Sequence, residues 1–204
     1  MKEIKVRVTL QEDMLGTAPN NQEVYRDYIA SKAPDAKSVE DEIASVGVEE
    51  YGDKMITVFH RNPETGKPII YDYLVKGFFK NAANAMRNAT GSKSAKLKAY
   101  KKHIDNLVFV EPRMIDLQGN YEMKDGKLPL CERPLRASTA QGERIALASS
   151  EVIPAGTVLE FTITVLDDTM MGYVYEWLDY GKWNGLGQWH NSGKGRFSWE
   201  ELPM

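Results

Sequence analysis

An apolar stripe between residues 74 and 89 constrains the fold more than any other feature of the sequence. Its members recur at intervals of three and four residues, the spacing that places side chains on one face of an α-helix. They are Val75, Phe78, Phe79, Ala82, Ala83 and Met86. Lys76, Lys80 and Arg87 fall on the opposite face. The pattern predicts a helix over 74–89 with an apolar face toward a core and a basic face turned away from it.

Strands are predicted on either side of this helix. Residues 2–10 alternate between apolar and polar side chains, as a half-buried strand does. Residues 107–110 form a short continuous apolar run, which predicts a buried central strand. The longest strand is predicted over 157–166, and it precedes an amphipathic helix over 170–181 and a last strand over 194–199.

Two long segments interrupt this order. Residues 11–70 predict helices at 22–32 and 39–46, followed by a hairpin whose strands, 55–60 and 69–71, flank a turn at 62–66. Residues 112–156 contain scattered glycines and prolines and predict an elaborated loop with one or two ribbons, such as 144–148.

Without the two insertions the order is strand, helix, strand, strand, helix, strand. This is the order of the ferredoxin-like (RRM-like) βαββαβ unit, an antiparallel sheet with two helices on one face. The chain has 204 residues and shows no linker and no internal repeat. We therefore expect one α+β domain, 1–204, with insertions at about 11–70 and 112–156.

A glycine-rich loop is predicted between the second helix and the last strand. It contains two Gly-x-Gly pairs, Gly185 with Gly187 and Gly193 with Gly195. Glycine is entropically costly, so such a density indicates positive φ angles or a close approach of the backbone. Bare backbone N–H groups of this kind are accessible to an anion such as phosphate. The alternative is a tight loop that merely lets the last strand join the sheet.

Charge is unevenly distributed along the chain. The formal net charge of −3 argues against a protein that coats nucleic acid by bulk charge. Acidic residues concentrate at 35–53, whereas 76–102, which includes a predicted short helix at 94–103, has no acidic residue. Its eight cations are Lys76, Lys80, Arg87, Lys93, Lys96, Lys98, Lys101 and Lys102. Such a run is either a solvated face or a functional surface.

The remaining chemistry-bearing residues exclude several classes of site. The single cysteine, Cys131, suggests a buried structural thiol, because it has no partner for a disulfide or a zinc site. Asp167 and Asp168 stand at a predicted helix start and are explained as N-caps more simply than as metal ligands. There is no P-loop and no Ser/His/Asp order, so neither a metal nor a cofactor is predicted. The absence of a long apolar run or a signal peptide predicts a cytoplasmic protein without a membrane partner.

Three stretches occur in the order of the motifs of a known superfamily. They are Leu-Val-Lys-Gly-Phe-Phe-Lys at 74–80, Glu-Val-Ile-Pro-Ala-Gly-Thr at 151–157 and the glycine loop at 185–195. Together they resemble the RAMP superfamily, the RNA-binding proteins of CRISPR systems, and in particular its effector-backbone subunits. The chain departs from that pattern at 72–73, where the family has a serine, and over 11–70. It is also similar to uncharacterised proteins of bacteriophages and prophages.

The resemblance implies non-catalytic binding of RNA or of a smaller nucleotide ligand. Lys76, Lys80 and Arg87 would then face the ligand. The backbone of Gly185, Gly187, Gly193 and Gly195, with Lys194 and Arg196, would hold phosphates, and Trp189 would stack on a base. Arg136, with Arg133 and Arg144, lies in the insertion where effector subunits carry a projecting thumb, which makes it a further candidate contact.

Two alternatives stay open. Metal-independent RNA cleavage, as in the RNA-processing branch of the superfamily, needs a general base and a general acid. Of the three histidines, His60, His103 and His190, the last is the best candidate because the glycine loop holds it.

The second alternative is a protein-interaction role. Effector-backbone subunits form homo-oligomers, and a phage-encoded protein in the host cytoplasm would act in counter-defence by binding a host protein or by sequestering a nucleotide signal.

Overall fold

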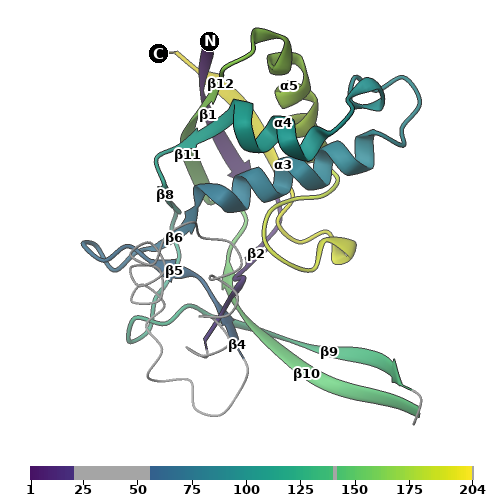
Figure 1. The fold of residues 1–204 in the computed structure, drawn as a ribbon. Helices are drawn as coiled ribbons and strands as arrows, with labels where there is room; N and C mark the ends of the chain where they lie inside the picture. Colours follow the sequence, from purple (N-terminus) through teal and green to yellow (C-terminus); the bar gives the residue numbers. More distant parts are fainter. Residues whose placement is uncertain (21–55, 140–141, 204) are drawn as a thin grey trace. The chain divides into compact units, whose positions relative to one another are not determined.

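The computed structural model (Figure 1) describes residues 1–20, 56–139 and 142–203, without the side chains of 135–146. The described chain divides into two compact units. Unit 1 comprises Met1–Met14, Ile69–Asn120 and Pro154–Met204. Unit 2 comprises Leu15–Pro68 and Tyr121–Ile153, two segments that lie inside the predicted insertions. The helices predicted at 22–32 and 39–46, like the acidic segment 35–53, lie outside the described residues.

A four-stranded antiparallel sheet forms the centre of unit 1. Its strand order is β12-β1-β11-β7. Val6 of β1 lies opposite Phe161 of β11 on one side and Glu201 of β12 on the other. The predicted alternation is confirmed, because Ile4, Val6, Val8 and Leu10 are all at most 2% exposed. The strands are β1 (Lys2–Leu10), β7 (Val108–Glu111), β11 (Val158–Val165) and β12 (Phe197–Leu202).

Two of the predicted strands differ from the observed ones. The prediction of a central strand is wrong for β7: within the described part of the chain it pairs with β11 alone, at the edge of this sheet, and its Phe109 is 41% exposed. A continuous apolar run does not distinguish an edge strand from a central one. β12 begins at Phe197 and not at 194, because the backbone of Gly195 and Arg196 bonds to Asp13, Gln11 and Glu12.

The first predicted helix is present as α3 (Asp72–Met86). It starts earlier than expected at an acidic residue, which the positive end of the helix dipole favours. Val75, Phe78, Phe79, Ala82 and Ala83 are buried, as the stripe predicted. Figure 1 shows α3 running across the sheet of unit 1. Its aromatic residues anchor it: Phe79 lies 5.8 Å from the ring of Trp177, and Phe78 packs edge-on against Phe197.

The predicted helix at 94–103 is wrong in its bounds. A short 3-10 turn, η2 (Ser94–Lys96), and a separate helix, α4 (Tyr100–Leu107), take its place. The break falls at Ala99, whose φ of 50° is left-handed and ends any continuous helix. The turn is held by a distant carboxylate: Glu176 accepts hydrogen bonds from the backbone N–H groups of Lys93 and Ser94 at 2.6 and 2.9 Å.

The second predicted amphipathic helix is α5 (Met171–Tyr180), preceded by the 3-10 turn η3 (Asp168–Met170). Asp167 caps that turn, since its Oδ1 accepts from the backbone N–H of Thr169 at 2.9 Å and from its hydroxyl at 2.8 Å. These hydrogen bonds lower the pKa of Asp167. Val174, Trp177 and Leu178 are buried against the core. The two hydrogen bonds to Thr169 support the interpretation of Asp167 as a cap.

Unit 2 is built mainly of strands. Its longest feature is the antiparallel ribbon of β9 (Leu130–Thr139) and β10 (Gly142–Ile153), which contains the predicted ribbon at 144–148 and is far longer (Figure 1). The expected strand at 55–60 is interrupted at Phe59, whose N–H donates to the buried carboxylate of Glu151 at 2.8 Å. The turn at 62–66 is present and closes with a hydrogen bond from Asn62 N–H to Lys67 O at 2.8 Å.

The shorter strands of the chain are β2 (Met14–Leu15), β3 (Ala18–Pro19), β4 (Ile56–Val58), β5 (His60–Arg61), β6 (Pro68–Tyr71) and β8 (Met114–Asp116).

The expected α+β class is confirmed at this level. The described residues form several sheets, antiparallel except for the pairing of β10 with β4, and three α-helices, α3, α4 and α5. Within the described ranges, no helix is long and apolar enough to cross a membrane.

Candidate nucleic-acid interface

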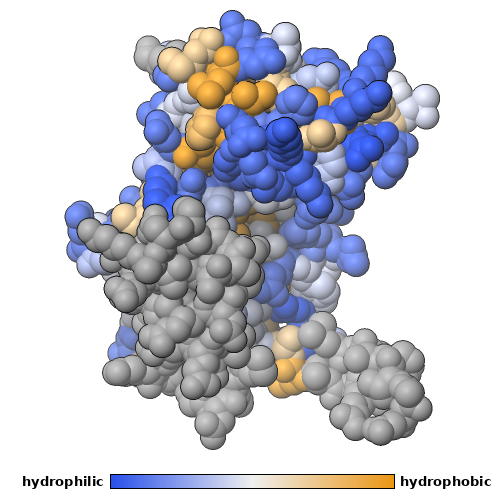
Figure 2. Space-filling view, viewed as in Figure 1, coloured by the Kyte–Doolittle hydropathy of each residue, from blue (hydrophilic) through white to orange (hydrophobic). Residues whose placement is uncertain are grey.

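The cations predicted on one face of α3 continue onto the segment that follows it. Arg87, Lys93, Lys96, Lys98, Lys101 and Lys102 are exposed, and we call these six the cationic surface. None of the six forms an ion pair with another described residue. Hydrophilic residues dominate the face of unit 1 on which α3 and α4 lie (Figure 2). Arg87 lies 5.2 Å from the centre of the Tyr100 ring, a contact that leaves its charge in place. Six exposed cations without a carboxylate partner in the described ranges produce a positive potential that favours polyanions.

Lys76 and Lys80 are placed differently from the six. Both lie on α3 next to Asp105 of α4: Lys80 Nζ is 2.6 Å from its carboxylate, and Lys76 Nζ donates to its backbone carbonyl at 3.2 Å. The Lys76 ammonium also lies 5.1 Å from the centre of the Phe109 ring. Partial burial lowers the pKa of Lys76. The structure therefore brings these two predicted contacts together, but it already supplies them with partners.

The glycine loop closes on itself at a narrow neck. Leu186 N–H donates to Gly195 O at 2.9 Å, so the two ends of the loop lie side by side. A Cβ added to Gly185 would be 1.7 Å from Gly195 O, and one added to Gly195 would be 1.7 Å from Leu186 O. Gly187, Gly193 and Gly195 have φ of 86°, 80° and 73°, which only glycine adopts without strain. Gly185 and Gly195 are thus required by the crossing of two backbone segments, and Gly187 and Gly193 by their positive φ.

Several N–H groups of this loop already have acceptors within the protein. Gly193 N–H donates to His190 O at 2.8 Å, and Gly195 N–H donates to Asp13 O at 2.8 Å. Lys194 is paired as well, since its Nζ lies 2.8 Å from Asp13 Oδ2. That hydrogen bond lowers the pKa of Asp13. The loop is therefore tied to Asp13, in the segment that follows β1, and its backbone is less open to an anion than the glycine pattern alone suggests.

Three further predicted contacts lie in the loop or directly after its neck. Trp189 is 39% exposed and has a left-handed φ of 61°, a genuine outlier for a bulky residue. His190 begins the 3-10 turn η4 (His190–Ser192), where its Nε2 lies 3.0 Å from Gly187 O and burial lowers its pKa. Arg196 packs beside Gly193, and its Nε has no hydrogen-bond partner among the described residues.

The arginines predicted in the second insertion belong to unit 2. Arg133 is buried and donates to Ser150 Oγ at 3.0 Å, so it has a structural role in the β9–β10 ribbon. The side chains of Arg136 and Arg144 are not among those that the structure describes. Cys131, expected to be buried, is only half-buried on β9. No group of three or more His, Cys, Asp or Glu in the described residues could hold a metal ion.

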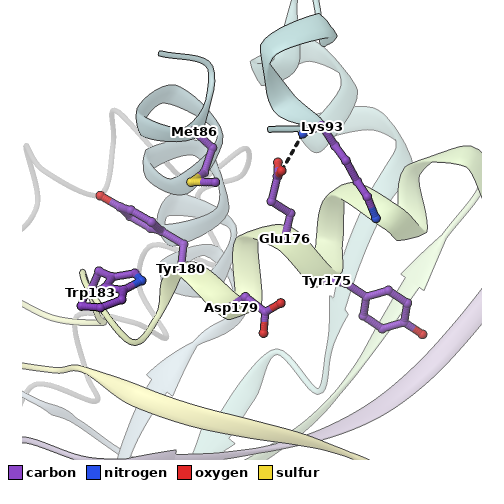
Figure 3. Close-up of a pocket in the computed structure, with 7 residues that line it drawn as sticks. All are labelled: Met86, Lys93, Tyr175, Glu176, Asp179, Tyr180 and Trp183. Carbon is purple, nitrogen blue, oxygen red and sulfur yellow. Dashed lines mark hydrogen bonds between the residues drawn. The ribbon is translucent and has the colours of Figure 1, made fainter. Parts of the chain in front are cut away.

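A pocket on α5 was not predicted from the sequence. It has a volume of about 370 Å³ and is lined by Met86, Lys93, Tyr175, Glu176, Asp179, Tyr180 and Trp183 (Figure 3). Trp183 is 70% exposed. The available sequence signal was the aromatic pair Tyr180 and Trp183, spaced three residues apart at the end of an amphipathic helix.

Comparison with known proteins adds a likeness of fold. No protein-family model and no curated protein matches the chain. A chain of a Type IV-B CRISPR complex matches all of this chain and 91% of its own length, with a TM-score of 0.51 at 11% identity. A chain of the Type III-B Cmr-beta complex bound to cognate target RNA matches 98% of this chain, with a TM-score of 0.50 at 11% identity.

The two likenesses differ in extent. This chain spans 58% of the Cmr-beta chain's length, so that chain is considerably longer. At 11% identity both establish a fold similar to that of chains in CRISPR complexes, and nothing about activity. They do not bear on a phage or prophage source, which stays a prediction.

Proposed function

We propose that this chain is a non-catalytic RNA- or nucleotide-binding protein of the RAMP type, either CRISPR-associated or phage-encoded. In this proposal unit 1 is a ferredoxin-like core. The strand order β12-β1-β11-β7, with α3 in the connection from β1 to β7 and α5 in that from β11 to β12, supports it. The likeness to chains of two CRISPR complexes supports it independently. Unit 2 would then be built from the two insertions of a single RAMP-like domain.

The cationic surface carries the functional part of the proposal. Its six side chains are exposed and form no ion pair with a described residue, although the chain as a whole is acidic. Neutralisation of phosphates by such cations releases counterions and drives binding to nucleic acid. Lys76 and Lys80 would extend the surface when the ligand competes with Asp105.

The glycine loop would contribute a second contact. Trp189 offers a partly exposed ring for stacking on a base, and base–aromatic stacking contributes about 1–3 kcal/mol. Arg196, with its Nε unpartnered in the described structure, would approach phosphate from the same loop. His190 would contact the ligand without acting as a base or acid, since its Nε2 already lies against a backbone carbonyl of the loop.

The ligand is identified first from the freshly purified protein. The ratio of absorbance at 260 and 280 nm reports bound nucleic acid, and mass spectrometry after heat release distinguishes RNA from a small nucleotide. RNA or nucleotide in the released fraction is the expected result. A clean protein spectrum, together with no binding of added RNA or nucleotides, would contradict the proposal.

Charge substitutions then test the surface. We expect Lys96→Gln, Lys101→Gln and Lys102→Gln together to weaken binding of single-stranded RNA and to reduce the salt slope by about 2, or about 0.7 for each lost phosphate contact. The matched control is Lys2→Gln, Lys67→Gln and Lys124→Gln, which changes net charge equally elsewhere in the chain. Asp105→Asn should strengthen RNA binding and increase the salt slope, because it removes the ion-pair partner of Lys80. Equal salt slopes in the two triple variants would exclude the cationic surface as the binding site.

A double variant tests Arg196, beside the glycine loop, together with Lys76 of α3. Arg196→Ala combined with Lys76→Ala is expected to weaken binding and to lower its salt dependence. If this double variant binds RNA and small nucleotides as the parent does, the two residues are not contacts.

A further inference from the structure

The pocket on α5 combines aromatic rings with carboxylates. Asp179 and Glu176 lie on successive turns of the helix, and Tyr180 and Trp183 border the same hollow (Figure 3). The backbone of Trp183 is fixed by a hydrogen bond from its N–H to Tyr180 O at 2.9 Å, so the exposed indole projects from an ordered turn. The pocket lies entirely within unit 1.

Neither carboxylate has a cation as partner in the described structure. Both oxygens of Glu176 accept from neutral groups, the N–H of Lys93 and the N–H and hydroxyl of Ser94. Asp179 Oδ1 accepts from the indole N–H of Trp199 at 3.1 Å. These bonds position the carboxylates and leave their negative charge uncompensated. Among the described residues that line the pocket, Lys93 is the one cation, and it extends along α5 to Gly172, on the side away from Trp183 (Figure 3).

Exposed aromatic faces next to uncompensated carboxylates are suited to a cation. The ring faces attract positive charge, and the carboxylates add a Coulomb attraction. The same charges repel phosphate, which distinguishes this pocket from the cationic surface. An arginine guanidinium suits it better than a lysine ammonium does, because its planar group stacks on an indole and donates to a carboxylate at the same time.

We propose that this pocket is a docking site for an arginine side chain of a partner protein. The guanidinium would stack on Trp183 and donate to Asp179, with Tyr180 and Met86 against its aliphatic stem. The proposal does not rest on the RNA-binding function. Of the six cations of the cationic surface, Lys93 alone borders the pocket, and its ammonium extends away from Trp183. The proposal assigns unit 1 two sites of opposite charge, one for a polyanion and one for a basic segment of protein.

A pair of peptides that differ only in charge tests the proposal. The full-length protein, labelled with ¹⁵N, is titrated with acetyl-Gly-Arg-Gly-amide and with the same peptide carrying citrulline, which keeps the shape and loses the charge. We expect the indole N–H resonance of Trp183 to shift with the arginine peptide, at concentrations up to about ten millimolar, and not with citrulline. Trp183→Phe assigns this resonance among the four tryptophans.

Two variants connect the shift to the pocket. Asp179→Asn keeps an acceptor for Trp199 and removes the charge, and it should weaken arginine binding by about two- to fivefold. Asp168→Asn removes the same charge outside the pocket and should leave the affinity unchanged. Three outcomes would each overturn the proposal: no shift with the arginine peptide, equal shifts with citrulline, or a shift with short RNA in place of the peptide.

Discussion

Units 1 and 2 bury different kinds of side chain. In unit 1, Val6, Phe79, Ile163 and Trp177 are fully buried, and the interior is mostly apolar. In the described part of unit 2, charged and polar groups are buried as well: Glu151 is 0% exposed, His60 3% and Arg133 6%. Apolar periodicity in a sequence therefore predicts an interior like that of unit 1. It does not predict an interior that contains charged and polar side chains, as that of unit 2 does.

Glu151 shows how the interior of unit 2 is held together. Its Oε1 accepts from Arg61 Nη2 at 2.6 Å and from the N–H of Leu128 at 3.4 Å, and its Oε2 accepts from the N–H of Phe59. One carboxylate thus connects three segments of unit 2. A buried charge is tolerated only when paired and hydrogen-bonded in this way.

The largest expected effect comes from removing one member of a buried ion pair. Arg61→Ala removes the guanidinium that lies 2.6 Å from the buried Glu151 carboxylate, and we expect unit 2 to lose about 3–5 kcal/mol of stability. The matched control in unit 1 is Arg7→Ala. Arg7 lies 2.7 Å from Glu160 and 3.2 Å from Glu200, and its side chain is 40% exposed, so its removal should cost a small fraction of the loss expected for Arg61→Ala.

Hydrogen exchange of peptides from β10 and β1 measures the two effects separately. Similar losses of stability in Arg61→Ala and Arg7→Ala would show that burial does not make one Arg–Glu pair more important than the other. The contrast drawn between the interiors of units 1 and 2 would then be wrong.

A smaller effect is expected at the neck of the glycine loop. Gly195→Ala combines a positive φ with a Cβ that meets backbone at 1.7 Å, so we expect a loss of about 3 kcal/mol in unit 1. Gly66→Ala in unit 2 has a similar φ of 68° and open space around the added Cβ, and should cost about 1 kcal/mol. Thermal unfolding compares the two variants. Equal losses would mean that the neck is not tightly packed.

The smallest of the three effects depends on pH. Burial lowers the pKa of His60 to about 3, with a contribution from the Arg61 guanidinium. Between that value and the ordinary pKa near 6.5, the unfolded chain binds a proton that folded unit 2 does not. Stability present above pH 6.5 is therefore lost as pH falls, by about 1.4 kcal/mol at pH 5.5.

Denaturant unfolding of the parent and of His60→Gln near pH 7.5 and 5.5 checks this expectation. The variant should lose less stability than the parent over that interval, and an identical pH dependence would contradict the assignment to His60.

Some features of the molecule were predictable from the sequence alone. The alternation in β1, the stripes of α3 and α5 and the α+β class follow from local periodicity, because each side chain's face is set by residues within a few positions of it. The positive run at 76–102 was likewise visible, and its exposed members form the cationic surface.

Other features were decided by contacts between residues distant in sequence. Lys194 pairs with Asp13 across 181 residues, and Gly195 at the neck of the glycine loop bonds to the same residue. Glu176 of α5 accepts hydrogen bonds from the backbone at 93–94 and holds a turn where a helix was predicted. The edge position of β7 depends on which strands pair in the sheet. The pocket on α5 arises in the same way, since α3, α5 and the chain after each helix must come together to form it. The local sequence pattern determines which face of a helix or strand a side chain lies on. Tertiary packing determines which distant residue that side chain contacts.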